Sequence, residues 1–341
     1  MADDSVPAGA LQQEQGSDLL EAYTSQSESD VDSAYNDIVS ETASVTSSIL
    51  AGKFENGRRY HAYGQQEYMF PDDEQEQDRL DIKYASINLV FGQGTDGTLF
   101  APVKDPQTIL DIGTGTGIWA IDCGEEYPGA TVYATDLSPI QPAWVPPNVK
   151  FEIDDAEKPW TFDPNFFDVV HTRTMTGCIR DWQRLAQQAF VHIKPGGYLE
   201  CQEMDYMTVV QSDSQNPGEA ILLWCKQQGE AAAKAGISLR TSTSYLKTLM
   251  ESVGFVDVVT REFKLPIGPW ASDRTLRNAG LLQMSAMLEG MEGISLRLFT
   301  HYTNWTLEEL HVLLAKCRTE IKDKRLHAYW TLPVVYGRKP E

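Results

Sequence analysis

The sequence lacks several features that would place it in well-known protein classes. Its five cysteines are scattered over 341 residues without a Cys-X-X-Cys pair, which argues against a disulfide framework and against a zinc site. No apolar run approaches the roughly 18 residues of a membrane-spanning helix. No basic and apolar leader precedes the rest, as a secretory signal would. We therefore expect no metal, no membrane span and a cytoplasmic protein, with the nucleus as a further location.

Positive charge is also scarce. The chain has 28 Lys or Arg against 49 Asp or Glu, for a net charge of −21. Residues 1–50 contain ten acidic residues and no Lys or Arg, and residues 51–80 contain seven acidic and four basic residues. Such a field excludes binding of nucleic acid or anionic lipid through overall charge. We expect no direct nucleic acid binding, and any partner of the acidic N-terminal segment should be a basic protein.

The composition divides the chain into three parts. Residues 1–45 are rich in Ser, Asp, Glu and Gln and have few large apolar residues, which predicts a disordered head. Residues 46–100 contain an aromatic stretch, FENGRRYHAYGQQEYMF, and a helix-like segment, QDRLDIKYASINLVFG. We expect them to form an N-terminal cap on a main domain that spans residues 101–341.

Short apolar runs alternate with helix-like segments from Thr108 onward. The runs lie at 108–112, 130–136, 149–153, 167–172, 196–204, 255–265 and 331–339, with helices expected between most of them. This alternation predicts an α/β fold, a parallel sheet with helices on both faces. The stretch 266–326 separates the last two strands, is rich in Leu, Met and Trp, and predicts an inserted helical lid.

A glycine-rich turn follows the first of these strands. Glycines stand at 113, 115 and 117, Asp111 lies at the end of the strand, and the local sequence is DIGTGTG. Glycine lets the backbone turn tightly and approach a ligand closely. The dinucleotide fingerprint GxGxxG would need glycine at position 118, where Ile118 stands. A nucleotide-dependent oxidoreductase is therefore disfavoured.

The turn resembles motif I of the class I S-adenosylmethionine-dependent methyltransferases. The resemblance implies a Rossmann-like sheet of seven strands and S-adenosylmethionine as cofactor. It places the cofactor against Asp111, Gly113, Thr114, Gly115 and Gly117.

Two further acidic positions fit the same cofactor. Asp136 ends the second strand, next to Leu137, where a carboxylate can accept both ribose hydroxyls. Asp154, Asp155 and Ala156 follow the third strand, and family resemblance places an acidic residue here on the adenine amino group. Asp155 is slightly favoured over Asp154, while an Asx turn or helix cap is the alternative for both.

The fourth strand ends in His171, Thr172 and Arg173, without the [N/D]PP[Y/F] tetrapeptide of many nitrogen methyltransferases. That absence counts against DNA adenine methylation. His171 is the first candidate for a general base beside the cofactor, and Glu203 is the second; a structural histidine is the alternative. Arg173 binds an acidic acceptor group or pairs with an acidic side chain.

Four longer segments narrow the resemblance. GRRYHAYGQQEYMFPDDEQEQDRLDIK, the block from Ile179 to Trp182, KPGGYLECQEMD and FKLPIGPW are similar to the fungal LaeA-like methyltransferases, which act in secondary metabolism as regulators or as tailoring enzymes. The resemblance implies a lid role for Tyr60 and Tyr63 over the cofactor and a contact between Arg59 and the cofactor carboxylate. A stably packed arm is the alternative.

The acceptor site is the least defined part of the prediction. Met284 and Met287 share a helical face in the insertion, a pattern that is more often core packing than a ligand pocket. With Trp270 and Tyr206 they could enclose an apolar acceptor. We expect a methyltransferase that acts on a small molecule in fungal secondary metabolism; the alternative is a LaeA-like regulatory protein in a nuclear or signalling complex.

Overall fold

The structure is a computed structural model that describes residues 52–63, 68–95 and 97–341. Within these ranges the chain forms one compact unit. The disordered head predicted for residues 1–45 lies outside the described residues.

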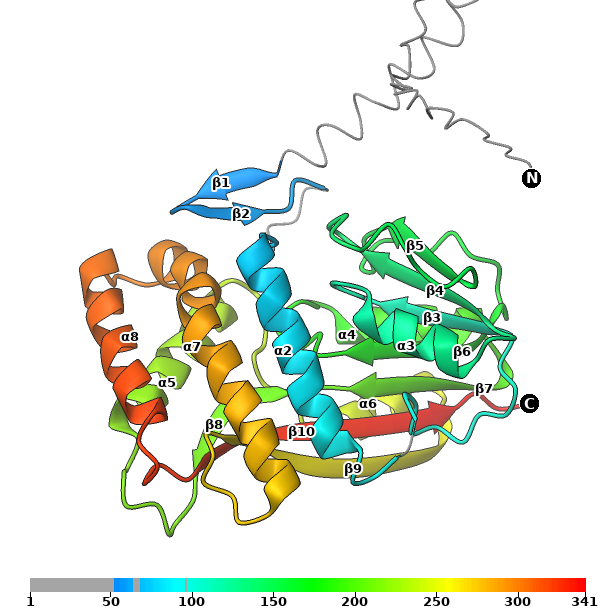
Figure 1. The fold of residues 1–341 in the computed structure, drawn as a ribbon. Helices are drawn as coiled ribbons and strands as arrows, with labels where there is room; N and C mark the ends of the chain where they lie inside the picture. The colour runs from blue at the N-terminus through cyan, green and yellow to red at the C-terminus, as the bar shows by residue number, and fades with distance from the viewer. Residues whose placement is uncertain (1–51, 64–67, 96) are drawn as a thin grey trace, which may run out of the picture. The chain divides into compact units, whose positions relative to one another are not determined.

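A mixed sheet forms the centre of the fold (Figure 1). Its parallel half has the order β5 (Val149–Ile153), β4 (Thr131–Asp136), β3 (Thr108–Ile112), β6 (Phe167–Arg173) and β7 (Ile193–Gln202). The antiparallel half consists of β10 (Ala328–Arg338), which pairs with β7, with β8 (Asp205–Val210) and with β9 (Val256–Ile267). The chain order reverses between β3 and β6, and such switch points are where open α/β sheets bind ligands.

Alternate residues of β3 enter two different cores. Ile109 packs with Trp119 of α3 (Ile118–Glu126) on one face of the sheet. Leu110 packs on the other face, with α4 (Trp182–His192) and α6 (Thr243–Val253). Successive strand side chains point to opposite faces, so a sheet covered on both sides needs continuous apolar runs. The predicted α/β fold with helices on both faces is confirmed.

One strand was not expected. β8 follows β7 after a break at Glu203 and Met204, and both strands pair with β10. The sheet therefore has eight strands among the described residues, one more than the seven that the sequence predicted. The apolar runs identified in the sequence include none at Asp205–Val210.

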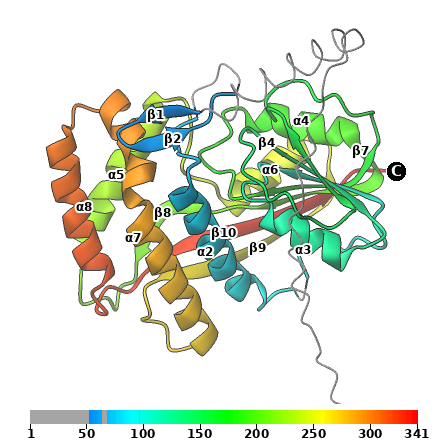
Figure 2. The same cartoon turned by 45° about the horizontal axis from the view of Figure 1, so that its top comes forward.

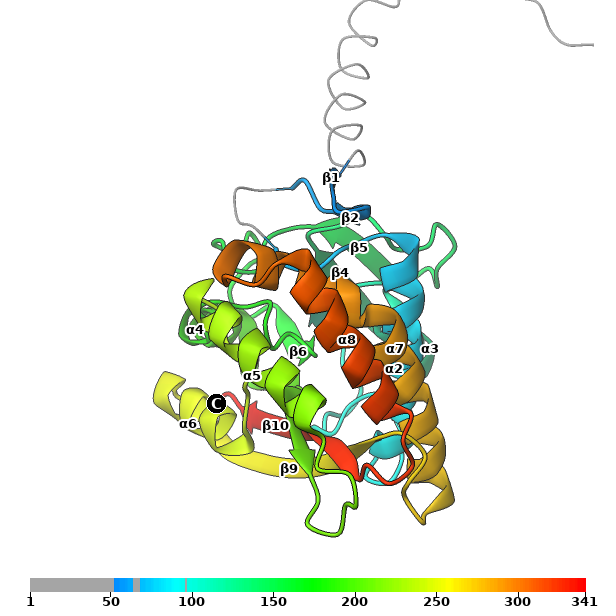
Figure 3. The same cartoon turned by 90° about the vertical axis from the view of Figure 1, so that its left-hand side faces the viewer.

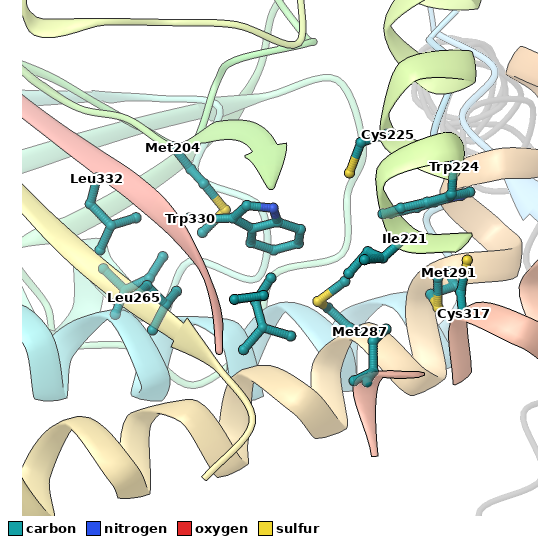
Figure 4. Packing of buried hydrophobic residues seen from close by; sticks show 14 of the residues in the cluster. Met204, Ile221, Trp224, Cys225, Leu265, Met287, Met291, Cys317, Trp330 and Leu332 are labelled. Atoms are coloured by element: carbon teal, nitrogen blue, oxygen red, sulfur yellow. The ribbon is translucent and has the colours of Figure 1, made fainter. Parts of the chain in front are cut away.

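A layer of long helices covers the antiparallel half of the sheet (Figure 3). α7 (Arg274–Tyr302) packs along α2 (Glu74–Phe91), and α5 (Glu219–Lys234) packs against α7 and α8 (Leu307–Ile321). Their apolar side chains form one cluster with β9 and β10, which includes Leu265, Met287, Trp224 and Trp330 (Figure 4). Both α7 and α8 lie within the helical insertion predicted at residues 266–326.

A short hairpin precedes α2. Its strands are β1 (Lys53–Glu55) and β2 (Arg58–Tyr60), and Figure 2 shows it beside α7. Arg58 donates two hydrogen bonds to Asp73, at 2.7 and 2.6 Å, and Arg297 of α7 donates one to Glu55 at 2.9 Å. These ion pairs attach the hairpin to α2 and α7. The boundary between a cap at 46–100 and a domain at 101–341 remains a prediction.

Candidate active site

The glycine-rich loop connects β3 to α3 at the switch point of the sheet. Gly113 and Gly117 have φ angles of 67° and 81°, in the left-handed region that favours glycine. A Cβ at Gly113 would overlap the Met175 side chain, and one at Gly117 would overlap the Phe151 ring. Gly113 and Gly115 line an adjoining cavity, whereas Gly117 does not. The loop thus presents bare backbone to the cavity at two of its three glycines.

Asp136 holds this loop from the end of β4. Its carboxylate accepts hydrogen bonds from the backbone N–H of Gly115 at 2.8 Å and of Ser138 at 3.0 Å. Withdrawal from water raises the pKa of Asp136 to about 6. The carboxylate lies on the cavity wall beside Leu137 and has acceptor sites left over for a ligand, because each oxygen can accept two hydrogen bonds.

Asp154, Asp155 and Ala156 also lie on the cavity wall, after β5. The Asp154 carboxylate accepts from the backbone N–H of Asp155 at 2.8 Å, and the Asp155 carboxylate accepts from that of Glu157 at 3.0 Å. The Asp155 bond closes an Asx turn, which was the alternative considered, whereas the Asp154 bond joins adjacent residues. One oxygen of each carboxylate makes these bonds, so the turn and a ligand contact are compatible.

The cavity extends from this sheet edge to the helical layer. It contains about 1700 Å³ of empty space, its open mouth included. The sheet edge is polar, whereas the far wall is mainly apolar and aromatic. Representative residues of the far wall are Met207, Trp224, Ile237, Leu239, Met287 and Trp330. The same cavity could therefore hold a polar ligand at the loops and an apolar ligand against the far wall.

A polar cluster from α2 interrupts the apolar wall. Glu76, Arg79 and Lys83 lie on the cavity wall, although each is less than 10% exposed. Arg79 donates to the Glu76 carboxylate at 2.9 Å, and Lys83 Nζ donates to the Tyr206 hydroxyl at 3.2 Å. Burial, together with the nearby Arg79 charge, lowers the pKa of Lys83 to about 7.

His171 and Asp111 lie inside the fold and not on the cavity wall. The two residues pair in register on β6 and β3, and His171 Nδ1 lies 2.8 Å from a carboxylate oxygen of Asp111. The imidazole is fully buried and stacks on the Trp119 ring, with 3.7 Å between ring centroids. The predicted base therefore has no contact with the space open to an acceptor, because its imidazole is enclosed by Asp111 and the Trp119 ring.

Glu203 is also buried away from the cavity. Its carboxylate accepts from the Thr172 hydroxyl at 2.9 Å, from the Thr176 backbone N–H at 2.9 Å and from the Thr176 hydroxyl at 3.0 Å. Burial raises the pKa of Glu203 to about 7. These bonds connect the end of β7 to the loop after β6. Glu203, the second predicted base, therefore stabilises this connection and does not face the cavity.

Arg173 does lie on the cavity wall. Its guanidinium donates to the Asn88 side chain at 2.7 Å and lies 4.4 Å from the centre of the Tyr84 ring. Burial lowers the pKa of Arg173 to about 10, which still leaves it charged at neutral pH. The residue brings positive charge to the sheet edge of the cavity, as its predicted role requires.

The N-terminal aromatic segment contributes to the cavity through residues other than those first chosen. Tyr63 lies on the wall, as predicted, together with His61 and Tyr68. Tyr60 does not, because it is fully buried under the Arg297 guanidinium at 3.4 Å from its ring centre. Arg59 donates to the Asp72 carboxylate at 2.8 Å, so its guanidinium already has an anionic partner within the fold.

The predicted acceptor residues are divided in the same way. Tyr206 and Met287 line the cavity, whereas Met284 packs against the apolar cluster of the helical layer. Trp270 donates to the backbone oxygen of Ala328 at 2.8 Å and is away from the cavity wall. Thr114 is likewise absent from the wall; its N–H donates to the backbone oxygen of Thr135.

Sequence reasoning missed the polar residues of α2. Glu76, Arg79 and Lys83 recur at helical spacing on the side of α2 that also carries the buried Ile87 and Val90. Charged residues that share the buried stripe of an amphipathic helix were the available signal. They show that this stripe faces a cavity as well as a core.

The described residues contain no group of three His, Cys, Asp or Glu side chains arranged to hold a metal ion. None of the helices described is both long and apolar enough to cross a membrane.

Comparison with known proteins decides the family. A methyltransferase domain model matches residues 93–260. The methyltransferase pytC of Aspergillus terreus is 38% identical over 92% of this chain and 96% of its own length. The chain belongs to the S-adenosylmethionine-dependent methyltransferases. The protein-methionine methyltransferase laeA of Emericella nidulans is 34% identical over 84% of this chain and 76% of its own length. The secondary metabolism regulator laeA of Aspergillus flavus is 34% identical over 84% of this chain and 77% of its own length. The resemblance to the LaeA-like group is confirmed.

Among solved structures, phosphoethanolamine N-methyltransferase 2 of Haemonchus contortus, bound to phosphomonomethylethanolamine and S-adenosylhomocysteine, is 20% identical, with a TM-score of 0.42. The match covers 78% of this methyltransferase and 61% of the worm enzyme, so this chain spans less than two thirds of that protein's length.

Proposed function

We propose that this methyltransferase holds S-adenosylmethionine at the sheet edge of the cavity and methylates a small, largely apolar acceptor enclosed by the helical layer. The observation that carries the proposal is the continuity of the cavity, from Gly113 and Asp136 at the loops to Trp224 and Trp330 at the far wall. A methyl group can be transferred only within direct reach, so donor and acceptor must share one space.

The residues at the sheet edge suit the cofactor. Gly115 leaves room where a Cβ would stand, and Asp136 keeps acceptor sites for two ribose hydroxyls. Asp154 or Asp155 would accept from the adenine amino group. When bound, the cofactor supplies an activated methyl group on a positively charged sulfur.

Arg173 suits an anionic group at the junction of the two sites. Its charge lies beside the glycine loop, so either the cofactor's carboxylate or an acidic group of the acceptor would be its partner. His171, Asp111 and Glu203 would act as positioning residues. They fix the ends of β3, β6 and β7, from which the loops of the site extend.

The catalytic contribution of the chain is then mostly alignment and exclusion of water. Transfer discharges the sulfonium, so the leaving group needs no further activation, and the protein must hold the nucleophile in line with the methyl carbon. The apolar far wall would orient the acceptor skeleton and keep water from competing.

A regulatory role remains the second candidate, because named regulators of secondary metabolism are 34% identical over 84% of the chain. In that role a protein would be the acceptor or partner. We place the protein in the cytoplasm with the nucleus as a further location, and assign any basic protein partner to the acidic residues 1–50. The net charge of −21 supports the absence of direct nucleic acid binding.

Two measurements test the proposal. Calorimetry should detect binding of S-adenosylhomocysteine to the wild-type chain, and absence of binding would reject it. Incubation with methyl-labelled S-adenosylmethionine and a fungal extract should label the small-molecule fraction; label confined to protein would favour the regulatory candidate. Asp136→Ala should abolish labelling of either fraction, whereas Asp163→Ala, at an exposed position, should leave it unchanged.

A further inference from the structure

The far wall of the cavity holds a lysine without an acidic partner. Lys83 is only 5% exposed, and its nitrogen donates to the Tyr206 hydroxyl at 3.2 Å. Among the described residues no carboxylate lies within 4 Å of this nitrogen, and the nearby Glu76 is engaged by Arg79 at 2.9 Å. A buried ammonium without a counter-ion is costly, so the site favours the neutral amine, which is a base.

The charged and titratable groups around Lys83 come from every side of the cavity. Arg79 of the same helix disfavours the ammonium, as does burial itself, whereas Glu76, Cys178 after β6 and Glu203 at the end of β7 favour it. Burial and Arg79 prevail, and they lower the pKa of Lys83 to about 7. The amine can therefore exchange a proton near neutral pH.

We propose that Lys83, oriented by Tyr206, is the base that takes the proton from a phenolic or enolic hydroxyl of an apolar acceptor in the cavity. This inference rests on the proposed function and names its substrate class. It differs from the prediction for His171 and Glu203, since Lys83 and Tyr206 line the cavity and those two residues do not.

The proton and electron movements balance. The Lys83 amine takes the hydroxyl proton and becomes an ammonium, which leaves an oxyanion on the acceptor. The oxyanion attacks the methyl carbon, a C–O bond forms, the C–S bond breaks, and its electron pair remains on the sulfur of the demethylated cofactor. The proton then passes from Lys83 to water once product leaves.

The pKa of Lys83 indicates which class of acceptor hydroxyl it could deprotonate. Efficient proton transfer needs a base and an acid of similar pKa, and phenols titrate within about three units of neutrality. An aliphatic alcohol is far too weak an acid for an amine of this kind. An aromatic or conjugated acceptor also fits the wall of Trp224 and Trp330, whose rings favour stacked or edge contacts.

The local positive charge at the α2 end of the cavity supports the same class. When Lys83 is protonated, it and Arg79 lie together on the wall, and only Glu76 balances them among the groups that line this end. A bound oxyanion supplies the missing negative charge. The same charges would repel a protonated amine, so an amine acceptor is disfavoured.

A chromogenic phenol tests the inference without knowledge of the natural acceptor. 4-Nitrophenol absorbs differently as phenol and as phenolate, so its ionisation can be followed in the presence of the wild-type chain and S-adenosylhomocysteine. Bound probe should ionise at lower pH than free probe. Lys83→Met should raise the apparent pKa of bound probe by about one unit, a roughly tenfold loss of phenolate at a given pH, and Tyr206→Phe by less.

Controls separate the possible failures. Lys226→Met removes an exposed lysine and should match the wild type. Both site variants should still bind S-adenosylhomocysteine, and Tyr206→Phe keeps the test valid if Lys83→Met does not fold. Two results would overturn this inference if the wild type still binds S-adenosylhomocysteine. One is that the probe does not bind, and the other is that the bound probe ionises equally with and without Lys83. Loss of cofactor binding by the wild type would instead overturn the proposed function.

Discussion

Asp136 offers the sharpest test of the cofactor site. Its two carboxylate oxygens already accept from Gly115 and Ser138, and the proposed ribose bonds would use the remaining acceptor positions. Asp136→Asn keeps the size of the side chain but replaces one acceptor oxygen with an NH₂ group. That group would face a backbone N–H, and two donors cannot bond to each other.

The expected loss follows from the bonds involved. Two hydrogen bonds from ribose to a charged acceptor contribute about 1.5 kcal/mol each at the low end of their range. Their removal costs about 3 kcal/mol, which corresponds to a roughly 150-fold weaker affinity for S-adenosylhomocysteine. Isothermal titration calorimetry measures this directly, with Asp163→Asn as the exposed control. A change of less than threefold would refute the assignment of Asp136 to the ribose.

The pH dependence provides a second readout on the same residue. Because the pKa of Asp136 is raised to about 6, the carboxylate that accepts from ribose becomes protonated as the pH falls through that value. Affinity should therefore fall about tenfold between neutral pH and one unit below the pKa. The Asn variant should lack this component. A wild type whose affinity is constant across this range would contradict the argument.

Three other substitutions test the remaining parts of the site. His171→Ala should lower the free energy of unfolding by about 3 kcal/mol in urea titrations, since it leaves a cavity and an unpaired Asp111 carboxylate. Glu203→Gln should flatten the pH dependence of Tm. In the wild type, the folded-state pKa of Glu203 is raised to about 7, so the Glu203 carboxyl stabilises the fold below its unfolded-state pKa. That contribution is lost as the pH rises through 7. Gly113→Ala should abolish cofactor binding by forcing Met175 aside, as calorimetry would show.

The fold could be predicted from the sequence because short local patterns, the apolar runs and the turns between them, determine most of its strands. The apolar runs bounded by turns marked the strands, and a helix expected between the first two runs is α3 (Ile118–Glu126). Gly113 and Asp136 were placed at the cavity because both follow strand ends on the same edge of a parallel sheet. β8 was missed because six residues after an ended strand carry no signal that they will pair again with β10.

The orientation of individual side chains could not be predicted in the same way. His171 and Arg173 lie two residues apart at the end of β6, yet only Arg173 reaches the cavity. Both side chains point to the same face of the sheet, and the difference is their depth. His171 pairs with Asp111 inside the sheet, whereas Arg173 lies beyond the last residue of β3 that pairs with β6. The sequence alone does not show where β3 ends relative to β6. Lys83 was missed for the opposite reason, since a lysine on a helix usually faces water.

One part of the acceptor wall lies outside the segment that matches the methyltransferase domain. The methyltransferase domain match ends at residue 260 and begins at residue 93, whereas Arg79 and Lys83 come from α2 and Met287 from α7. Since α2 and α7 pack on each other, a change in α7 would reshape the acceptor end, whereas α2 also contacts the glycine loop through the bond from Thr116 to Asp81. Relatives that share the domain can therefore share the cofactor and differ in acceptor, and the charge that matters for the acceptor is the local one at Lys83 rather than the net −21 of the chain.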